Sequence, residues 1–500
     1  MRRLFVLVMT IAALYRLTLL DRGGLAFVDE TWYFKTLMTL QSLAAGDVRG
    51  ALGQVAATLG RPGATLVRLP VAALQVIPLA FGVAPSNPRS LLIPQVFNVA
   101  LSLGMLYLFF QIGVILCEDA SSALVATIVY AALINTNLYV RHVLPYDWAL
   151  FTFLLALWLS VRRPLTARRT CVIGALGGAM LTIYPGYYLL APVLSLSIIG
   201  QLWRDDRARA VRFATLFALA ASTVMGATML LCRAGGLSYI SSLRTVNGLQ
   251  EIGGMDERWT FVPEYLIRVE HLSGLALLVG VVVTTWHTAS RLRRGDLRLI
   301  DWLLLAALAA WAWQCTSYMP GHRTLLGRLI HPWMAFLAWA LAEAMAKIER
   351  SAFRALAFTA VVGAALISWV PSAHAYYQLA YPSDVLYALR IDTTRLPHDH
   401  MHCEFHGTTR SSVDSPGPLD RHTRYPYTTD TNFWLLNFCQ ALGLTAAPKP
   451  SWRESPPASA TLIFDGPHWM TFPAYGYEGL PPDARKALVN DGYRVRAYRR

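Results

Sequence analysis

The sequence predicts a polytopic α-helical membrane protein with a small α/β domain at its C-terminal end. Of the 500 residues, 55% are hydrophobic and 15% are charged, whereas a typical soluble domain carries about 25% charged residues. Apolar stretches long enough to cross a bilayer recur through most of the chain. The last part of the chain contains no such stretch and is rich in polar residues and proline.

The apolar stretches predict about eleven spanning helices, at about 20 residues for each crossing. The run from 170 to 203 is divided at Tyr184-Pro185-Gly186, because proline and glycine end or kink a helix. The predicted spans lie near residues 3–20, 91–116, 122–140, 146–161, 170–184, 187–203, 211–232, 272–290, 300–318, 327–347 and 353–371.

Basic clusters between these segments predict the orientation of the chain. The net charge is +14, and its clustering follows the positive-inside pattern of membrane proteins rather than a nucleic-acid-binding surface. Residues 63–84 form an apolar segment that is interrupted by Arg68, Pro70 and Pro78. The basic clusters all lie on one side of the membrane only if this segment lies in the membrane interface and does not cross. The N-terminus is then cytoplasmic, and the tail lies outside a bacterial-type inner membrane. The clusters are Arg2 and Arg3, Arg162 to Arg169, Arg204 to Arg212, Arg291 to Arg298, and Lys347 to Arg354.

These features divide the chain into a membrane domain, 1–371, and an extracytoplasmic α/β domain, 372–500. Within the tail, Thr461–Asp465 and Tyr493–Tyr498 have the pattern of strands, and Phe433–Leu442 that of a helix. Cys403 and Cys439 both fall in the exported tail, where the compartment permits a disulfide; the sequence leaves open whether they are bonded. The histidines at 398, 400, 402 and 406 match no trusted zinc pattern, and we interpret them as a polar surface loop.

The first candidate for chemistry is FVDETWYF, which directly follows the first apolar segment. Asp29 and Glu30 would lie beside the membrane surface, where carboxylates are costly near lipid and therefore call for an explanation. Trp32 and Tyr33 suit the headgroup region because their rings are amphipathic. An arbitrary acidic pair at this place would more often be the solvated start of a loop.

A second candidate is Asp147 in the sequence RHVLPYDW. Taken alone, this aspartate is equally well explained as a helix N-cap. It would nevertheless share a face and depth with Asp29, close to Arg141 and His142. Carboxylates with cations nearby suit acid–base chemistry on a hydroxyl while a phosphate leaving group is held in place.

The predicted outer face also carries arginines and a tyrosine-rich turn. Any one arginine there is readily explained as an anchor for lipid headgroups. As a set they suit a lipid phosphate or diphosphate, which the guanidinium fork matches. Tyr184, in the Pro-Gly turn, is either an interface aromatic or a contact for sugar or lipid. The arginines are Arg61, Arg68, Arg141, Arg323 and Arg328.

The sequence contains no phosphate-binding P-loop, dinucleotide glycine fingerprint or GxSxG motif. The substrate must therefore carry its own driving force.

The order of these motifs over about residues 1–350 resembles the GT-C glycosyltransferases. The likeness is to the branch that uses lipid-linked sugars, which includes the protein O-mannosyltransferases and the lipid A aminoarabinose transferase. In that family an acidic pair and an aromatic follow the first span, then a Gly-Asp, a basic residue with proline, an interfacial helix ending in Phe-Gly, and an outer turn with aspartate. The matching residues are Asp29-Glu30-Thr31-Trp32-Tyr33, Gly46-Asp47, Arg61-Pro62, Phe81-Gly82, Pro145-Tyr146-Asp147-Trp148, Leu181-Thr182-Ile183-Tyr184-Pro185, and Arg328 with Pro332.

The resemblance implies an inverting transfer from a polyprenyl-phosphate sugar to a hydroxyl of a lipid, glycan or protein. Asp29 would be the general base or orient the acceptor, with Glu30 supporting it, while Asp147 positions acceptor or sugar. Ile183 stands where the family often has lysine, and family metal ligands have no clear counterpart, so no metal ligand is assigned and dependence on a divalent metal stays open. The remaining substrate-binding residues would be Trp32, Tyr33, Asp47, Arg61, Arg141, His142, Tyr184 and Arg328.

Two other functions remain alternatives at this point. A polysaccharide polymerase or ligase would use a diphosphate-linked oligosaccharide, and the early acidic pair argues against it. A lipid or sugar transporter would need charges along a path through the bilayer. Asp301 and Glu343 fall near the ends of predicted spans, and Arg16 can extend its side chain toward the surface. The sequence also shows no internal repeat of the kind common in transporters.

Overall fold

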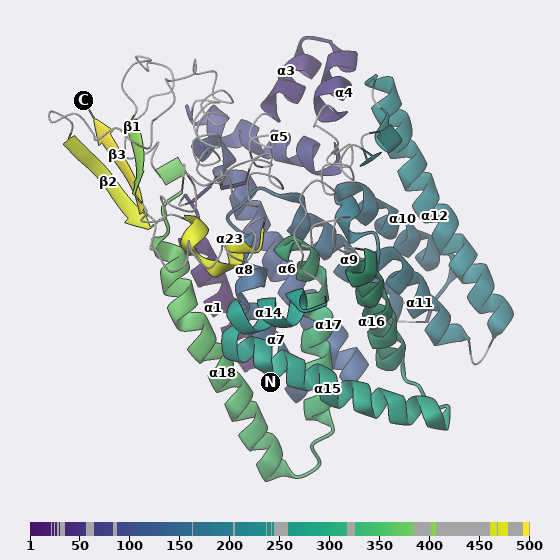
Figure 1. Cartoon of the computed structure of the whole chain (residues 1–500). Helices are drawn as coiled ribbons and strands as arrows, with labels where there is room; N and C mark the ends of the chain where they lie inside the picture. The colour runs from purple at the N-terminus through teal and green to yellow at the C-terminus, as the bar shows by residue number, and fades with distance from the viewer. Residues whose placement is uncertain are drawn as a thin grey trace.

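Helices of alternating direction form a bundle in the computed structural model, and the C-terminal tail packs against one end of it (Figure 1). That end, where α1, α10 and α18 finish and α9, α15 and α17 begin, is called the tail-bearing end below. The structure describes residues 1–21, 23–24, 26–27, 30, 36–56, 65–83, 88–162, 164–203, 206–236, 238–241, 243–244, 259–317, 326–381, 383–384, 402–406, 461–467, 469–478 and 494–499.

The helices follow the apolar segments of the sequence closely. Each predicted span overlaps a helix, and the predicted interfacial segment contains α5. The helices of the N-terminal half are α1 (Arg2–Thr18), α3 (Leu37–Ala44), α4 (Val48–Ala56), α5 (Thr65–Ala80), η2 (Pro88–Leu91), α6 (Leu92–Cys117), α7 (Ala120–Ala132), α8 (Ile134–Leu138), α9 (Pro145–Val161), α10 (Ala167–Ile183), η3 (Pro185–Tyr187), α11 (Leu190–Leu202) and α12 (Arg207–Ala234). Those of the second half are α14 (Phe261–Arg268), α15 (His271–Arg294), α16 (Leu299–Ser317), α17 (Gly327–Ala346) and α18 (Ser351–Gln378).

Within the described residues, 6 helices are long and apolar enough to cross a membrane, as in a helical membrane protein. The larger number of spans expected from the sequence stays a prediction, because the remaining apolar helices are shorter than a full crossing. The six are Arg89–Cys117, Pro185–Leu202, Arg207–Ala234, His271–Arg294, Gly327–Ala346 and Ser351–Gln378; the shorter ones are Val67–Ala80, Ala120–Ala132, Pro145–Val161 and Leu299–Cys315.

Small residues set the closest helix packing in the bundle. In α10, a Cβ added to Gly174 would lie 2.4 Å from the carbonyl oxygen of Phe217, and one on Gly178 would lie 2.5 Å from that of Ala221. Both contacts are with α12, which lies against α10 along its length (Figure 1). This spacing of two glycines four residues apart lets helix backbones approach closely in a membrane protein.

An ionic cluster ties α15, α16 and α17 together at the end opposite the tail. The Arg291 guanidinium donates to Asp301 over 2.8 Å and to Glu343 over 3.2 Å. Arg298 and Lys347 also pair with Glu343, at 3.3 and 3.4 Å. Asp301 and Glu343 therefore lie at helix ends, as the sequence indicated, and their charges are compensated where they are buried.

The tail contains a three-stranded antiparallel sheet in the order β1-β3-β2. The strands are β1 (His402–His406), β2 (Thr461–Pro467) and β3 (Arg494–Arg499). The two strands predicted near 461 and 493 are confirmed, whereas residues 402–406 form a strand and not the expected loop. The helix predicted at 433–442, and with it Cys439, lies outside the described residues.

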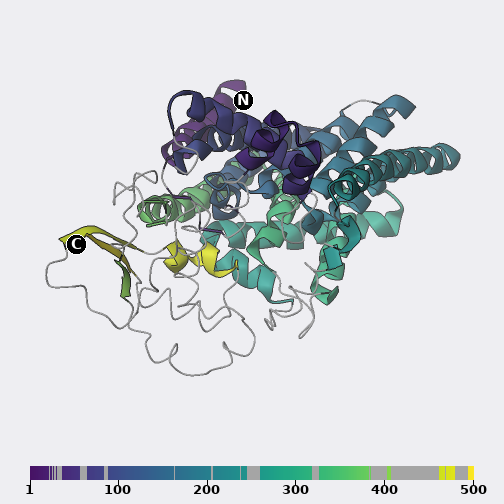
Figure 2. The same ribbon diagram turned by 90° about the horizontal axis from the view of Figure 1, so that it is seen from above.

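Between β2 and β3, residues 469–478 form a short segment that enters the bundle surface. This tail segment contains η4 (Trp469–Thr471) and α23 (Pro473–Gly476), and it lies between the sheet and the helices in both overall views (Figures 1 and 2). Trp469, Phe472 and Tyr475 are buried. The Gly327 N–H, at the start of α17, donates to the Tyr477 carbonyl over 2.8 Å. The tail segment is therefore part of the packed protein.

Candidate functional site

The site is built around residues 133–147, where an expected continuous span is interrupted. Leu133 has an extended conformation, with φ −60° and ψ 137°, and it separates α7 from the short α8. Polar side chains of α8 bind carbonyls that the break leaves without helical partners. Thr136 Oγ1 donates to the Tyr130 carbonyl over 2.7 Å, and Asn137 Nδ2 donates to that of Ala131 over 2.9 Å. The polar triplet Asn-Thr-Asn thus explains why the segment 122–140 is two helices and not one.

Two amides of α6 hold the following turn. Gln95 Nε2 donates to the Arg141 carbonyl over 2.9 Å, and Asn98 Nδ2 donates to the His142 carbonyl over 2.8 Å. Asn98 is itself held by the indole N–H of Trp148, at 2.9 Å. The backbone between α8 and α9 is therefore fixed by buried hydrogen bonds rather than by solvent.

Glu270 caps the start of α8 from a distant part of the sequence. Its two carboxylate oxygens accept the N–H groups of Ile134, at 2.7 Å, and Asn135, at 2.8 Å. Burial raises the pKa of Glu270 to about 7, and the two backbone hydrogen bonds oppose that shift. The N-terminal N–H groups of a helix need such acceptors, so Glu270 positions Asn135 for its contact with the next residue of the site.

His331, in the first turns of α17, lies between Asn135 and Asp147. Its Nδ1 is 2.7 Å from Asn135 Oδ1 and its Nε2 is 3.0 Å from Asp147 Oδ1. Asn135 Nδ2 faces the Gly327 carbonyl, which only accepts, so Asn135 Oδ1 is the acceptor for a proton on His331 Nδ1. A second proton must then lie between Nε2 and Asp147. The pair is therefore either an imidazolium with a carboxylate or an imidazole with a carboxylic acid.

Asp147 retains one oxygen for a further partner. The side chain is buried, with 1% exposed surface, and its Oδ2 has no hydrogen-bond partner among the described residues. Arg16 Nη1 and the hydroxyls of Tyr130 and Tyr187 are likewise buried and unpaired within that part of the chain. All three residues lie within electrostatic range of Asp147. Unsatisfied buried polar atoms are unusual, and several around one carboxylate mark a place where a ligand or water would bind.

Arg16 does not extend to the surface, contrary to the expectation from the sequence. It is 1% exposed, and its Nε donates to Asn137 Oδ1 over 2.9 Å. The reason is that α8 offers a buried polar partner at the level of the last turn of α1, so one nitrogen of the guanidinium is hydrogen-bonded inside the bundle. Its positive charge therefore contributes to the surroundings of Asp147.

Arg328 is a cation on α17, the helix that also carries His331. It precedes His331 by three residues on α17, so both side chains lie on one helix face. Its Nη1 donates to the Tyr146 hydroxyl over 2.6 Å, and its Nε lies 3.3 Å from the Glu478 carboxylate. Tyr184 packs edge-on against Tyr146, with ring centroids 4.8 Å apart. We call Asp147, His331, Asn135, Tyr146, Arg328 and Glu478 the Asp147 cluster.

A second carboxylate–histidine pair lies on the other side of the 133–147 segment. Glu30 Oε2 accepts the Phe27 N–H over 3.0 Å, and Glu30 Oε1 is 3.0 Å from His142 Nδ1. His142 Nε2 is 2.5 Å from the Tyr475 hydroxyl of the tail segment. A carboxylate only accepts, so His142 donates from Nδ1 and accepts from Tyr475 at Nε2. Every polar atom of the pair is thus satisfied.

Aromatic rings surround this second pair. The Tyr475 hydroxyl lies 2.9 Å from that of Tyr381, and burial raises the pKa of Tyr475 well above its usual range. Arg141 is buried beneath them, with its guanidinium 4.0 Å from the ring centroid of Tyr376 and 5.0 Å from that of Tyr381. We call Glu30, His142, Tyr475, Tyr376, Tyr381 and Arg141 the Glu30 cluster.

The structure unites some predicted site residues and separates others. Asp147, Tyr184 and Arg328 come together, while Glu30, His142 and Arg141 form the neighbouring cluster. Asp47 is exposed, and its carboxylate accepts the Gly50 N–H over 2.7 Å as a cap for α4, so it belongs to neither cluster. The predictions for Asp29, Trp32, Tyr33, Arg61 and Arg323 concern residues outside the described part of the chain.

The sequence analysis missed residues that complete both clusters. His331 and Asn135 stand inside apolar segments, and polar residues at such positions are a signal of function that could have been used. Glu270, Tyr475 and Glu478 come from a loop end and from the tail, and no spacing in the sequence relates them to Asp147 or Glu30. Only the three-dimensional packing brings them to the site.

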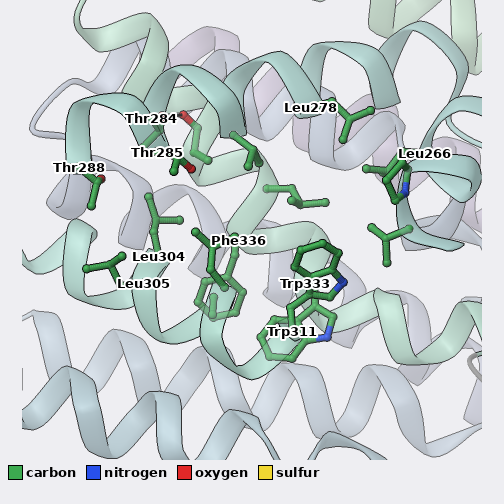
Figure 3. A pocket seen from close by; sticks show the side chains of 17 residues that line it. Leu266, Leu278, Thr284, Thr285, Thr288, Leu304, Leu305, Trp311, Trp333 and Phe336 are labelled. Atoms are coloured by element: carbon green, nitrogen blue, oxygen red, sulfur yellow. Dashed lines mark hydrogen bonds between the residues drawn. The ribbon is translucent and has the colours of Figure 1, made fainter. Parts of the chain in front are cut away.

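An apolar cavity of about 110 Å³ is lined in part by α17, the helix that carries His331 and Arg328 (Figure 3). It lies among α14, α15, α16 and α17, with Trp311, Trp333 and Phe336 along one side and threonines at one end. Trp333 follows His331 by two residues on α17, and Leu266 of the lining follows Tyr265, which binds Asn135 at 2.8 Å. The helix that carries His331 and Arg328 therefore also lines a space suited to an apolar chain.

Comparison with known proteins adds no family to these observations. No protein-family model matches the sequence, and no curated protein matches it. Among the described residues, no three or more His, Cys, Asp or Glu side chains are grouped to hold a metal ion.

Proposed function

We propose that this protein is a membrane glycosyltransferase that moves a sugar from a polyprenyl-phosphate donor to a hydroxyl of a lipid, glycan or protein. The observation that carries the proposal is Asp147. Its carboxylate has one oxygen without a partner among the described residues and a histidine on the other oxygen, and Arg328 lies one turn before that histidine on α17. A group that takes a proton from a hydroxyl and a cation that holds a departing phosphate are the two requirements of this reaction.

The chemistry can be assigned to these side chains. The acceptor hydroxyl gives its proton to the free oxygen of Asp147 as its oxygen bonds to the anomeric carbon. The bond from that carbon to the phosphate oxygen breaks with its electron pair on the phosphate. Arg328 stabilises the new negative charge, and His331 keeps Asp147 oriented. Asp29 remains the second candidate base from the resemblance to GT-C enzymes.

The placement of the charges supports an enzyme rather than a transporter. Arg16 is in the last turn of α1, Asp147 in the first turn of α9 and Arg328 in the first turn of α17. These turns meet at the tail-bearing end of the bundle, so the cluster is terminal and does not form a path between the two ends. The apolar cavity lined in part by α17 suits the hydrocarbon part of a lipid-linked donor.

Membrane orientation is part of the proposal. The basic connections between helices lie at the end opposite the tail, since the helices alternate in direction. By the positive-inside rule that end is cytoplasmic, which places the site and the tail on the outer face of the inner membrane.

The direct test is sugar transfer in membranes with a panel of radiolabelled polyprenyl-phosphate sugars. Wild-type protein is compared with Asp29→Asn and Asp147→Asn, and the amount of folded protein in the membrane is measured for each. We expect one donor to be consumed by the wild type and transfer to be lost in Asp147→Asn. Full transfer by Asp147→Asn would refute the assignment, and consumption of diphosphate-linked oligosaccharides alone would favour a polymerase or ligase.

A further inference from the structure

The cation proposed to hold the donor phosphate already has an anion beside it. The side chains of Arg328 and Glu478 are 13% and 4% exposed, and the ion pair between them measures 3.3 Å. The other oxygen of Glu478 accepts the Tyr139 hydroxyl. Burial and the Glu478 charge raise the pKa of Tyr139, so this hydroxyl stays protonated and continues to donate.

The same carboxylate lies at the beginning of α17. A Cβ on Gly327, the first residue of this 20-residue helix, would lie 3.0 Å from Glu478 Oε1. The N-terminus of a helix carries partial positive charge and favours carboxylate or phosphate groups. The helix end, the Arg328 guanidinium and the Tyr139 hydroxyl together form an anion site, and Glu478 is the anion present in it.

The tail segment covers the cluster in this arrangement. Asp147 and His331 are buried, while Tyr475, Tyr477 and Glu478 hold the segment on Tyr139, His142, Glu264, Gly327 and Arg328. A substrate can contact Asp147 only after covering residues move. An anion that competes for Arg328 would supply the free energy for that movement at the place where the segment is held.

We propose that Glu478 occupies the phosphate site in the substrate-free protein, and that the donor phosphate displaces it and releases the tail segment from the bundle. This inference rests on the proposed function for the identity of the anion. The tail segment is then a cover that opens only for a substrate with a phosphate, because an apolar chain without phosphate cannot replace the Glu478 carboxylate on Arg328.

Binding of polyprenyl monophosphate to the full-length protein in lipid nanodiscs tests the exchange, with the corresponding polyprenol as the uncharged probe. Glu478→Gln removes the competing charge and should tighten monophosphate binding about tenfold without changing polyprenol binding. Arg328→Gln should weaken monophosphate binding. The double variant with Glu478→Gln should bind monophosphate as weakly as Arg328→Gln alone. Glu264→Gln is the matched control, since Glu264 accepts the Tyr477 hydroxyl at 3.2 Å from the same segment and pairs with Arg268; it should bind as the wild type does.

Hydrogen exchange of residues 469–478 provides a second readout that needs no variant. Saturating polyprenyl monophosphate should speed exchange in this segment of the wild type, and polyprenol should not. Continued protection of the segment at saturation, or weaker monophosphate binding by Glu478→Gln, would overturn the inference. Both readouts are independent of sugar transfer, so a failure of the proposed reaction would be seen separately.

Discussion

The Glu30 and Asp147 clusters each contain a carboxylate–histidine pair, and the two pairs differ in how completely their polar atoms are hydrogen-bonded. Glu30 uses both oxygens and His142 both ring nitrogens, in bonds of 2.5 to 3.0 Å. Asp147 uses one oxygen and leaves the other buried without a partner among the described residues. Both pairs are covered by the tail segment, through Tyr475 in one case and Glu478 in the other.

This difference separates a structural role from a chemical one. Hydrogen bonds to every polar atom of a buried pair fix its arrangement, whereas an atom without a partner retains the capacity to bind. In the Glu30 cluster such atoms belong to Arg141, whose Nε and Nη1 have no partner among the described residues, and not to the carboxylate–histidine pair. The Glu30 cluster therefore holds the tail segment on the bundle. The Asp147 cluster, with an anion site and with an apolar cavity lined in part by its helix α17, is the place for the reaction.

The largest expected effect separates the two carboxylates directly. Asp147→Asn keeps the shape of the side chain and removes its ability to take a proton, so the turnover rate should fall by about 10² to 10⁴-fold. Glu30→Gln keeps an acceptor for either the Phe27 N–H or His142, and its turnover per folded molecule should stay within about threefold of wild type. Transfer rates normalised to the folded fraction in detergent measure both. Equal losses in the two variants would return Glu30 to the catalytic group assigned from the sequence.

Next in size is the effect of removing a partner from the satisfied cluster. His142→Ala leaves Glu30 buried and uncompensated, which should cost about 3 to 5 kcal/mol of stability. Thermal unfolding in detergent measures the loss, and protease sensitivity of the tail segment should rise with it. His374→Ala, on an exposed position of α18, is the control and should change neither. An unaffected melting temperature in His142→Ala would show that the Glu30 cluster does not hold the tail.

The sequence predicted the helices far better than the clusters. Runs of apolar residues are local and long, so each predicted span overlaps a helix, and Arg328 and Asp147 were recognised because they border such runs. The break at Leu133 was missed because Asn135, Thr136 and Asn137 were too few to interrupt the apolar pattern. The contacts of Glu270 and Glu478 join residues more than a hundred positions apart, and no periodicity carries that information. The burial of Arg16 has the same cause, since its partner Asn137 is on another helix.

A smaller effect concerns Glu270, for which the Glu30 cluster has no counterpart. The pKa of Glu270 is about 7 in the folded protein, against an ordinary value of 4.5. A raised pKa means that the folded state holds the proton more tightly, so this contribution to stability is complete below pH 4.5 and is lost as the pH rises through 7. The loss amounts to about 3 kcal/mol. Melting temperatures of the wild type and Glu270→Gln should be measured between pH 5 and 8. The wild type should lose stability relative to the variant as the pH rises, so that the two curves converge or the variant becomes the more stable protein. Parallel curves would contradict this assignment.

The smallest expected effect tests whether the cavity belongs to the Asp147 cluster. Ala307 lines the cavity from α16, and Ala307→Phe should fill part of it. Displacing about two methylene groups of a lipid chain costs about 1.6 kcal/mol, at about 0.8 kcal/mol each, so the KM for a long-chain polyprenyl-phosphate donor should rise about tenfold. A short-chain donor that does not reach the cavity should keep its KM, and kcat should be unchanged for both. Ala310→Phe, at a buried position on the same helix that does not line the cavity, controls for the strain of a larger side chain. An equal rise for long and short donors would mean that the cavity does not hold the lipid chain, and the Asp147 cluster would then be defined by its charges alone.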